Sequence, residues 1–261
     1  ARHGVVGALG HSLARAIDAE RVIERGARNV THLFNAMGGL HHRELGLAGG
    51  KLYVGGVFTT IGGQPRTRAA AVSPTSGAVD AGFRPTVDGS VYAIAAAPDA
   101  SKVYIGGPFN NVNGQADTDI STLDGATGAT VGPELTGVTG YVDDLQVTPD
   151  GRSLIAAHSG VPGVGNRTSL FDTASGRRSW LQMVDGDVQG AALVGNQVFT
   201  GFHDGSKGDG ATRVALYDRS TGAEDATFRP SFDRFMGAWA VDGDDNALVI
   251  AGNFSTISGV R

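Results

Sequence analysis

The feature that most constrains this chain is an internal repeat of about 50 residues. Its first copy, residues 53–58, reads Tyr-Val-Gly-Gly-Val-Phe, an apolar run that closes on small residues. Later copies follow at steps of 51, 50, 44 and 51 residues, and the aligned small residues are Gly56, Gly107, Ala157, Gly201 and Gly252. A unit of this size buries its apolar faces only against its neighbours, so the period predicts a repeat architecture.

A second recurring element keeps the same phase. It is a five-residue turn that ends in Gly and in three of its copies begins with Asp; the copies are residues 73–77, 124–128, 172–176 and 218–222. Their steps are 51, 48 and 46 residues. Asp and Gly are typical of turns, because the Asp side chain binds nearby backbone N–H groups and Gly tolerates positive φ. We therefore expect one such turn in each unit.

Each unit has room for about four short strands. In the second unit we expect strands over residues 91–97, 102–109 and 120–123, and a short outer strand over 130–133. Four antiparallel strands in about 40 to 50 residues are typical of a propeller blade. The predicted fold is mainly β, an incomplete or small β-propeller of about four to five blades. We expect the first unit to lack its innermost strand.

Residues 1–48 have a different character. They hold five of the seven His and a strand-helix-strand pattern: a strand at 5–9, a helix from Ser12 to Gly26, and a strand at 29–34. This order is the unit of a parallel α/β sheet or barrel. We therefore predict two domains, an α/β barrel fragment over residues 1–48 and propeller-like repeats over 49–261.

Composition excludes several classes of protein. The 21 Lys and Arg against 26 Asp and Glu give a net charge of −5, which argues against a nucleic-acid partner. The apolar runs are far shorter than the ~20 residues of a membrane span. With no Cys, neither a disulfide nor a thiolate metal site is possible. We expect no nucleic-acid partner and no membrane span.

The repeats resemble a bacterial propeller-like repeat family over residues 49–258. The shared sequence elements are a Gly-Gly-x-Phe strand, a Thr-Gly or Asp-Gly turn, and a Phe-x-Pro ending, which here lies at residues 83–85 and 228–230. The resemblance implies binding or scaffolding, with an unknown protein or carbohydrate ligand. It also implies a secreted or cell-surface location.

Two histidines of the first segment fall at the carboxyl ends of predicted strands. His11 and His32 would meet there on one face of a parallel barrel and could bind one divalent metal ion. Their spacing alone favours the alternative, two surface or half-buried histidines with no shared role. The surrounding text is more specific: residues 10–12, 31–37 and 42–46 read Gly-His-Ser, Thr-His-Leu-Phe-Asn-Ala-Met and His-Arg-Glu-Leu-Gly.

Together these three elements resemble the N-acetylglucosamine-6-phosphate deacetylase family of the amidohydrolase superfamily. The resemblance implies that His11 and His32 are metal ligands, that Asn35 and Ala36 contact the substrate, and that Arg43 contacts its phosphate. It also implies cytoplasmic amino sugar metabolism, with zinc as the metal.

The implied site is incomplete. A catalytic zinc site uses three protein ligands and a general base, whereas the resemblance supplies two His. The family's metal-binding Glu lies well before its Gly-His-Ser element and its catalytic Asp well after the Arg-Glu element, and neither segment has a counterpart here. We therefore assign no catalytic residue and expect no cofactor, with zinc possible where the half-site is completed.

The two resemblances meet on the Gly-rich residues 46–50 with no linker between them. Natural fusions usually join whole domains through an exposed linker, so a chimeric reading frame is the simplest interpretation. Two functional hypotheses remain. The chain is a binding or scaffold propeller module that carries an incomplete, inactive deacetylase-like fragment, or it is a metal-dependent deacetylase-related hydrolase.

Overall fold

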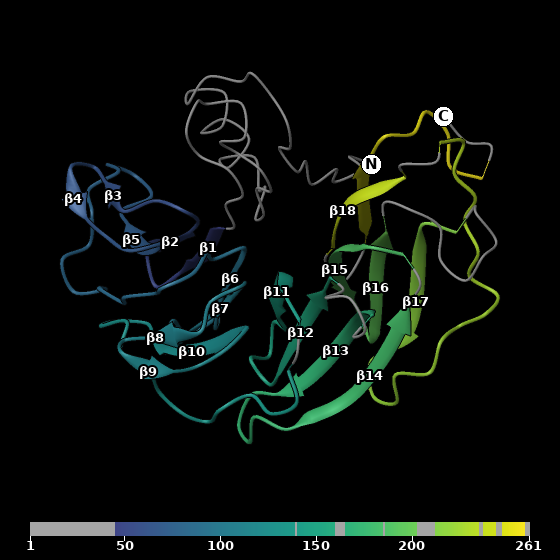
Figure 1. The fold of residues 1–261 in the computed structure, drawn as a ribbon. Coiled ribbons are helices and arrows are strands. Elements are labelled where there is room, and N and C mark those ends of the chain that lie inside the picture. Colours follow the sequence, from purple (N-terminus) through teal and green to yellow (C-terminus); the bar gives the residue numbers. More distant parts are fainter. Residues whose placement is uncertain are drawn as a thin grey trace.

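The computed structural model describes residues 45–138, 140–159, 165–184, 186–202, 212–234, 237–243 and 247–258. Within these ranges the regular structure is β throughout, with 19 strands and no helix (Figure 1). The part of the fold class that predicted mainly antiparallel β structure is therefore confirmed. The predicted strand-helix-strand pattern at residues 5–34 lies outside the described residues. In the described part of the chain, no helix could cross a membrane.

Five sheets follow one another along the chain, each with antiparallel neighbours. The first two comprise β1 (Leu45–Ala48), β2 (Lys51–Gly55) and β5 (Ala69–Val72), then β6 (Ala93–Ala96), β7 (Lys102–Gly106) and β10 (Ile120–Asp124). The third comprises β11 (Val142–Val147), β12 (Ser153–His158), β13 (Asn166–Asp172) and β14 (Arg178–Val184). The last two comprise β15 (Val188–Val194), β16 (Gln197–Phe202) and β17 (Val214–Asp218), then β18 (Ala238–Gly243) and β19 (Leu248–Gly252). Two hairpins, β3 (Thr60–Ile61) with β4 (Gln64–Pro65) and β8 (Asn111–Val112) with β9 (Gln115–Ala116), stand beside the first two sheets.

The second sheet tests the strands predicted for its unit. Three of them form as β6, β7 and β10; β6 and β7 are shorter than expected, and β10 is one residue longer. The outer strand predicted over residues 130–133 is reduced to one bridge between Leu123 and Thr130. Pro133 has no N–H to donate, which limits a ladder at this edge. The number of blades stays a prediction.

The expectation that the first unit lacks an innermost strand is wrong. β1 occupies that position and pairs with β2, with Leu47 opposite Leu52. The reason is local: Gly49 and Gly50 have φ of 57° and 72°, as a tight two-residue hairpin turn requires. Residues 45–48 thus belong to the first sheet, although they are part of the deacetylase-like segment. The domain boundary after residue 48 stays a prediction.

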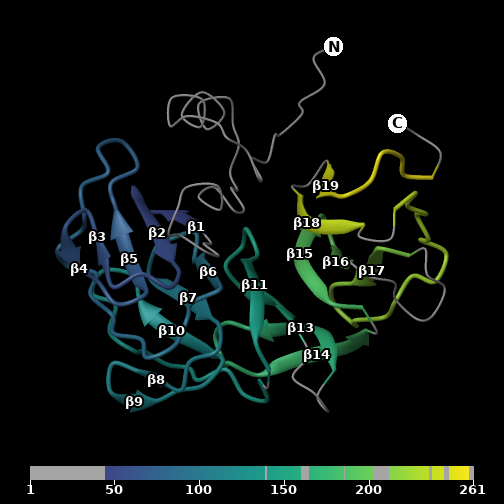
Figure 2. The same cartoon turned by 45° about the horizontal axis from the view of Figure 1, so that its top comes forward.

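The core lies between the sheets. Each of four apolar clusters joins two consecutive sheets; the first packs Tyr53 and Ala71 of the first sheet against Ile105 and Leu123 of the second. The inner strands contact one another in chain order, β1 with β6, β6 with β11, β11 with β15 and β15 with β18. The sheets therefore form an arc around a common axis, and its first and last sheets are apart in both views (Figure 2).

The recurring five-residue turn is confirmed as a structural element. In the second sheet, Asp124 Oδ1 accepts the backbone N–H of Thr127 (2.8 Å), and Gly128 N–H closes the turn on Asp124 O (2.8 Å). The same bonds recur in the turns that begin at Asp172 and Asp218. The four closing glycines have φ of 70–78° and are Gly77, Gly128, Gly176 and Gly222. The turn at residues 172–176 leads into the outer strand β14, whereas each of the other three turns is followed by a single bridge.

Candidate functional site: a row of bulged residues on the inner strands

The residues predicted from the deacetylase resemblance lie outside the described residues. They are His11, His32, Asn35, Ala36 and Arg43. Their roles stay predictions. Within the part of the chain that the structure describes, no group of three or more His, Asp or Glu is arranged to hold a metal ion.

The inner strands share a different feature, a β-bulge near the first residue. The register shifts between Val142 and Asp144 in β11, between Val188 and Gly190 in β15, and between Ala238 and Ala240 in β18. Bulges leave one residue outside the ladder and redirect its side chain, and they are common beside binding sites. Each of these three inner strands thus carries an extra residue near its N-terminal end.

The bulged residues are Asp143, Gln189 and Trp239, and Tyr92 holds the matching place in the second sheet. Tyr92 N–H donates to Gly106 O (2.7 Å), although Gly106 already pairs with Ala93. In each strand the residue before is fully buried, whereas the bulged residue is half-buried. We call Tyr92, Asp143, Gln189 and Trp239 the bulge row.

Asp143 is the member of the bulge row with the strongest chemical signature. Its Oδ2 is buried and has no hydrogen-bond partner in the described structure. Burial raises the pKa of Asp143 to about 6; hydrogen bonds from Ser159 oppose the rise, and the charge of Asp187 adds to it. Asp187 itself accepts a hydrogen bond from Asn166 Nδ2 (3.0 Å). In the part of the chain that the structure describes, Asp143 thus keeps one buried carboxylate oxygen without a hydrogen-bond partner.

The adjacent Asp144 has a structural role. Its Oδ2 accepts the backbone N–H of Ala191 (2.8 Å), and two residues on, Gln146 Oε1 accepts the N–H of Leu193 (2.7 Å). Both N–H groups lie on the free edge of β15, and an unpaired strand edge needs such partners. Burial also raises the pKa of Asp144 to about 6, with further contributions from the charges of Asp242 and Asp143. Asp144 thus fastens the third sheet to the fourth.

Two tyrosines, Tyr92 and Tyr141, lie in the same region as Asp143. The pKa of Tyr92 is raised by burial first, then by the charges of Asp143 and Tyr141, which places the three groups close together. Tyr141 is 42% exposed, one of the few large side chains in the described structure left so open. A carboxylate beside aromatic rings suits a cationic group, because the ring faces and the carboxylate both attract positive charge.

Two other features are less suited to a ligand. A groove of 390 Å³ is lined mainly by polar residues, among them Arg84 and Asn113. Asn113 is already engaged, since its Nδ2 donates to Gly128 O (2.9 Å) and its Oδ1 accepts from Thr86 N–H (2.9 Å). His158 is only 1% exposed, and burial lowers its pKa to about 3, so it is neutral and enclosed.

Sequence reasoning missed the bulge row because the repeats were aligned on their second strands. The inner strands carry their own signal: Val91-Tyr, Val142-Asp, Val188-Gln and Ala238-Trp align as a buried small apolar residue followed by a variable one. A position that differs from unit to unit within a regular repeat is where a repeat protein can hold a ligand.

Comparison with known proteins supports both resemblances. Residues 49–83 match the family described as a domain of unknown function (DUF5122) beta-propeller. The chain is also 46% identical over 46 residues to N-acetylglucosamine-6-phosphate deacetylase of Danio rerio and 48% identical over 46 residues to that of Bos taurus. These matches cover 18% of this chain and 11% of each relative, so the chain spans about a tenth of the length of these curated proteins.

Solved structures share the architecture. A chain in the structure titled "Kuenenia stuttgartiensis Hydrazine Synthase" superposes with a TM-score of 0.56 at 15% identity, covering 80% of this chain and 61% of that one. A chain in the "Crystal Structure of Mitotic Checkpoint Complex" gives 0.55 at 12% identity, covering 80% and 59%. At such identities the likeness concerns the fold alone. With the family match, it establishes a propeller-like fold that is accompanied by a short deacetylase-like segment.

Proposed function

We propose that this chain is a binding module whose bulge row holds a cationic group of its ligand, such as a lysine side chain of a protein partner. The observation that carries the proposal is Asp143, whose Oδ2 is buried without a partner. A ligand ammonium group would supply the missing partner and would offset the cost of burying this carboxylate. The neighbouring Tyr92 and Tyr141 would contact the apolar stem of the ligand.

Charge in this region supports the proposal. Asp187 adds a second negative group beside Asp143, and its charge contributes to the raised pKa of Asp143. A bound cation would lower that pKa, because an opposite charge favours the ionised carboxylate. Binding and ionisation of Asp143 are therefore coupled, and the affinity for a cation should rise with pH through about 6.

A peptide titration tests this function. The probes are the blocked tripeptide Gly-Lys-Gly and its Nε-acetylated form, which has no charge, each titrated into the full chain by calorimetry. We expect only the charged peptide to bind at pH 7.5, with at least threefold weaker binding at pH 5 and after Asp143→Asn. The matched control is Asp99→Asn, an exposed carboxylate in the turn after β6, which should bind as the parent does. Equal binding of both peptides, or no effect of Asp143→Asn, would refute the proposal.

A binding or scaffold function requires no catalytic activity, and we propose that the deacetylase-like segment is inactive in this chain. The second candidate function, a metal-dependent deacetylase-related hydrolase, is favoured by the match of 46% identity over 46 residues. Zinc analysis of the purified full chain separates the two, because one bound zinc per chain together with turnover of N-acetylglucosamine-6-phosphate would support the hydrolase. Zinc held by His11 and His32 should be lost in His11→Ala.

A further inference from the structure

Two hairpins in the molecule have the same backbone geometry. β3–β4 and β8–β9 lie 51 residues apart, and equivalent bonds close them: Arg66 N–H donates to Thr59 O (3.0 Å), and Asp117 N–H donates to Asn110 O (3.0 Å). The residue after the first strand has φ of 53° in both cases. The two hairpins are therefore equivalent surfaces on consecutive sheets.

The second of these hairpins is occupied by a segment from the preceding sheet. Val87 forms a bridge with Val112, and Asp88 Oδ1 accepts the backbone N–H groups of Asn110 (2.8 Å) and Asn111 (2.9 Å). Asn111 Nδ2 also donates to Asp88 Oδ2 (2.7 Å), and this side-chain bond first, then the two backbone bonds, lower the pKa of Asp88 to about 2. The docked segment, residues 83–88, reads Phe-Arg-Pro-Thr-Val-Asp.

The same docking recurs in the last described unit. Phe232 forms a bridge with Ile257, and Asp233 Oδ1 accepts the N–H groups of Ser255 (2.8 Å) and Thr256 (3.1 Å). The docked segment, residues 228–233, reads Phe-Arg-Pro-Ser-Phe-Asp. In both places a carbonyl two residues before the Asp accepts one more N–H, from Asn113 (2.8 Å) or Ser258 (2.7 Å). One recognition rule thus holds at two interfaces.

The β3–β4 hairpin of the first sheet has the same docking surface, but no segment of the described residues forms a bridge with it. No carboxylate of the described residues accepts the N–H groups of Thr59 and Thr60, the counterparts of Asn110 and Asn111. Ile61 is half-buried where Val112 is fully buried, and Val57 is 45% exposed.

The turn of the first sheet shows the same difference. A Cβ at Gly77 would meet no atom within 4 Å, whereas a Cβ at Gly128 would lie 2.5 Å from Pro85 of the preceding sheet. Among the described residues, nothing therefore covers on the first sheet the two surfaces that receive a preceding unit elsewhere in the molecule.

We propose that the β3–β4 hairpin binds a segment of the form Phe-x-Pro-x-(Val or Phe)-Asp presented by a further repeat unit of the same kind. The Asp carboxylate would accept the N–H groups of Thr59 and Thr60, and the apolar residue before it would pair with Ile61. The preceding carbonyl would accept the N–H of Gly62. The two segments of this form in the described chain are already docked, one on the β8–β9 hairpin and the other on residues 255–257. The occupant of the β3–β4 hairpin therefore comes from another unit. This surface is independent of the bulge row.

A peptide with the sequence of residues 81–90, Ala-Gly-Phe-Arg-Pro-Thr-Val-Asp-Gly-Ser, is the probe. We expect the fluorescein-labelled peptide to bind the full chain saturably in an anisotropy titration. Replacing the Asp of the peptide by Ala should weaken binding at least tenfold, and so should Ile61→Asp in the chain. Met183→Asp is the matched control, because Met183 is 50% exposed on the third sheet, and it should leave binding unchanged.

Hydrogen exchange locates the binding site. The peptide should slow exchange of the Thr59 and Thr60 amides while leaving those of Asn110 and Asn111 unchanged. Absence of saturable binding, protection at Asn110 instead, or indifference to Ile61→Asp would overturn the proposal. Concentration-dependent dimerisation that Ile61→Asp abolishes would identify a second copy as the occupant and would also overturn it.

Discussion

The carboxylates at the two ends of the strands, one with the recurring turns and the other with the bulge row, have opposite pKa shifts. At the turn end, which carries the recurring turns, the Asp side chains accept hydrogen bonds from backbone and hydroxyl groups, and the pKa values of Asp150 and Asp218 fall to about 2. Near the bulge row, burial instead raises the pKa values of Asp143 and Asp144 to about 6. The sign of the shift separates exposed carboxylates whose charge is stabilised by hydrogen bonds from carboxylates whose charge is disfavoured by burial.

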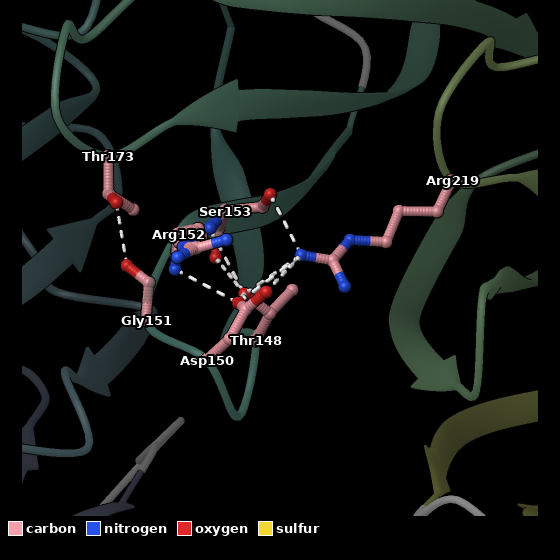
Figure 3. Close-up of polar contacts among 7 residues, drawn as sticks. All are labelled: Thr148, Asp150, Gly151, Arg152, Ser153, Thr173 and Arg219. Carbon is pink, nitrogen blue, oxygen red and sulfur yellow. Dashed lines mark hydrogen bonds and ion pairs between the residues drawn. The ribbon is translucent and has the colours of Figure 1, made fainter.

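The turn end is also where neighbouring sheets are fastened. Arg219, in the turn after β17, reaches Asp150 of the third sheet with N–O distances of 3.0 and 3.2 Å (Figure 3). Thr173 Oγ1 donates to Gly151 O (2.6 Å) in the same group. In this group both carboxylate oxygens of Asp150 have donors within the protein. The bulge end keeps an unpaired acceptor at Asp143.

The largest effect should come from breaking the docking of a turn. Gly176 has φ of 71°, and a Cβ there would lie 2.2 Å from Glu134 O of the preceding sheet. Gly176→Ala should lower the free energy of unfolding by about 2–4 kcal/mol, because it adds a backbone clash to positive-φ strain. The measurement is urea unfolding followed by circular dichroism.

Gly77→Ala is the matched control for the docked turn. Gly77 has φ of 70° but open space around its Cβ position, so only the strain of about 1 kcal/mol should remain. Equal losses in the two variants would show that the turns do not depend on the preceding sheet.

A smaller loss is expected from Asp144→Ala. It leaves the N–H of Ala191 on the edge of β15 without its acceptor, which should cost about 1–3 kcal/mol. Asp144→Asn keeps an oxygen at this place and should recover most of the stability at pH 7. If Asn proves as damaging as Ala, the edge contact is not what stabilises this interface.

The smallest effect should have the opposite sign. The folded-state pKa of Asp143 is raised, so its contribution to stability is present below pH 4 and is lost as pH rises through about 6. Asp143→Asn should therefore stabilise the chain by about 1 kcal/mol at pH 7.5 and leave it unchanged at pH 4. Thermal unfolding at both pH values measures this difference, and destabilisation at pH 7.5 would contradict it.

The depressed pKa values at the turn end give the reverse pH dependence. Stability from Asp150 and Asp218 is present above pH 4 and is lost as pH falls toward 2. In the Asp143→Asn variant this acid limb should remain unchanged, and of the two carboxylates with a pKa raised to about 6 only Asp144 should still contribute to the pH dependence above pH 4.

The sequence by itself determined the repeat, its phase and its turns. Asp124, Gly128 and their counterparts were predictable because a turn is a local structure, in which the Asp side chain binds N–H groups two or three residues away. The second strand of each unit was predictable for a similar reason, since its apolar run is bounded by Gly. The Gly49-Gly50 turn is also local and allows residues 45–48 to pair as a strand, although their resemblance to an enzyme had placed them outside the predicted sheet.

Only the tertiary structure decided which carboxylates are strained and which surfaces are uncovered. Asp143 and Asp144 are neighbours in the sequence, yet one has an unpaired oxygen and the other fastens the edge of β15, 47 residues away. Ile61 and Val112 hold equivalent places, yet only Val112 has a docked segment. Burial, pKa and docking depend on atoms that distant units bring into contact, whereas turns and strands depend on residues that are adjacent in the chain.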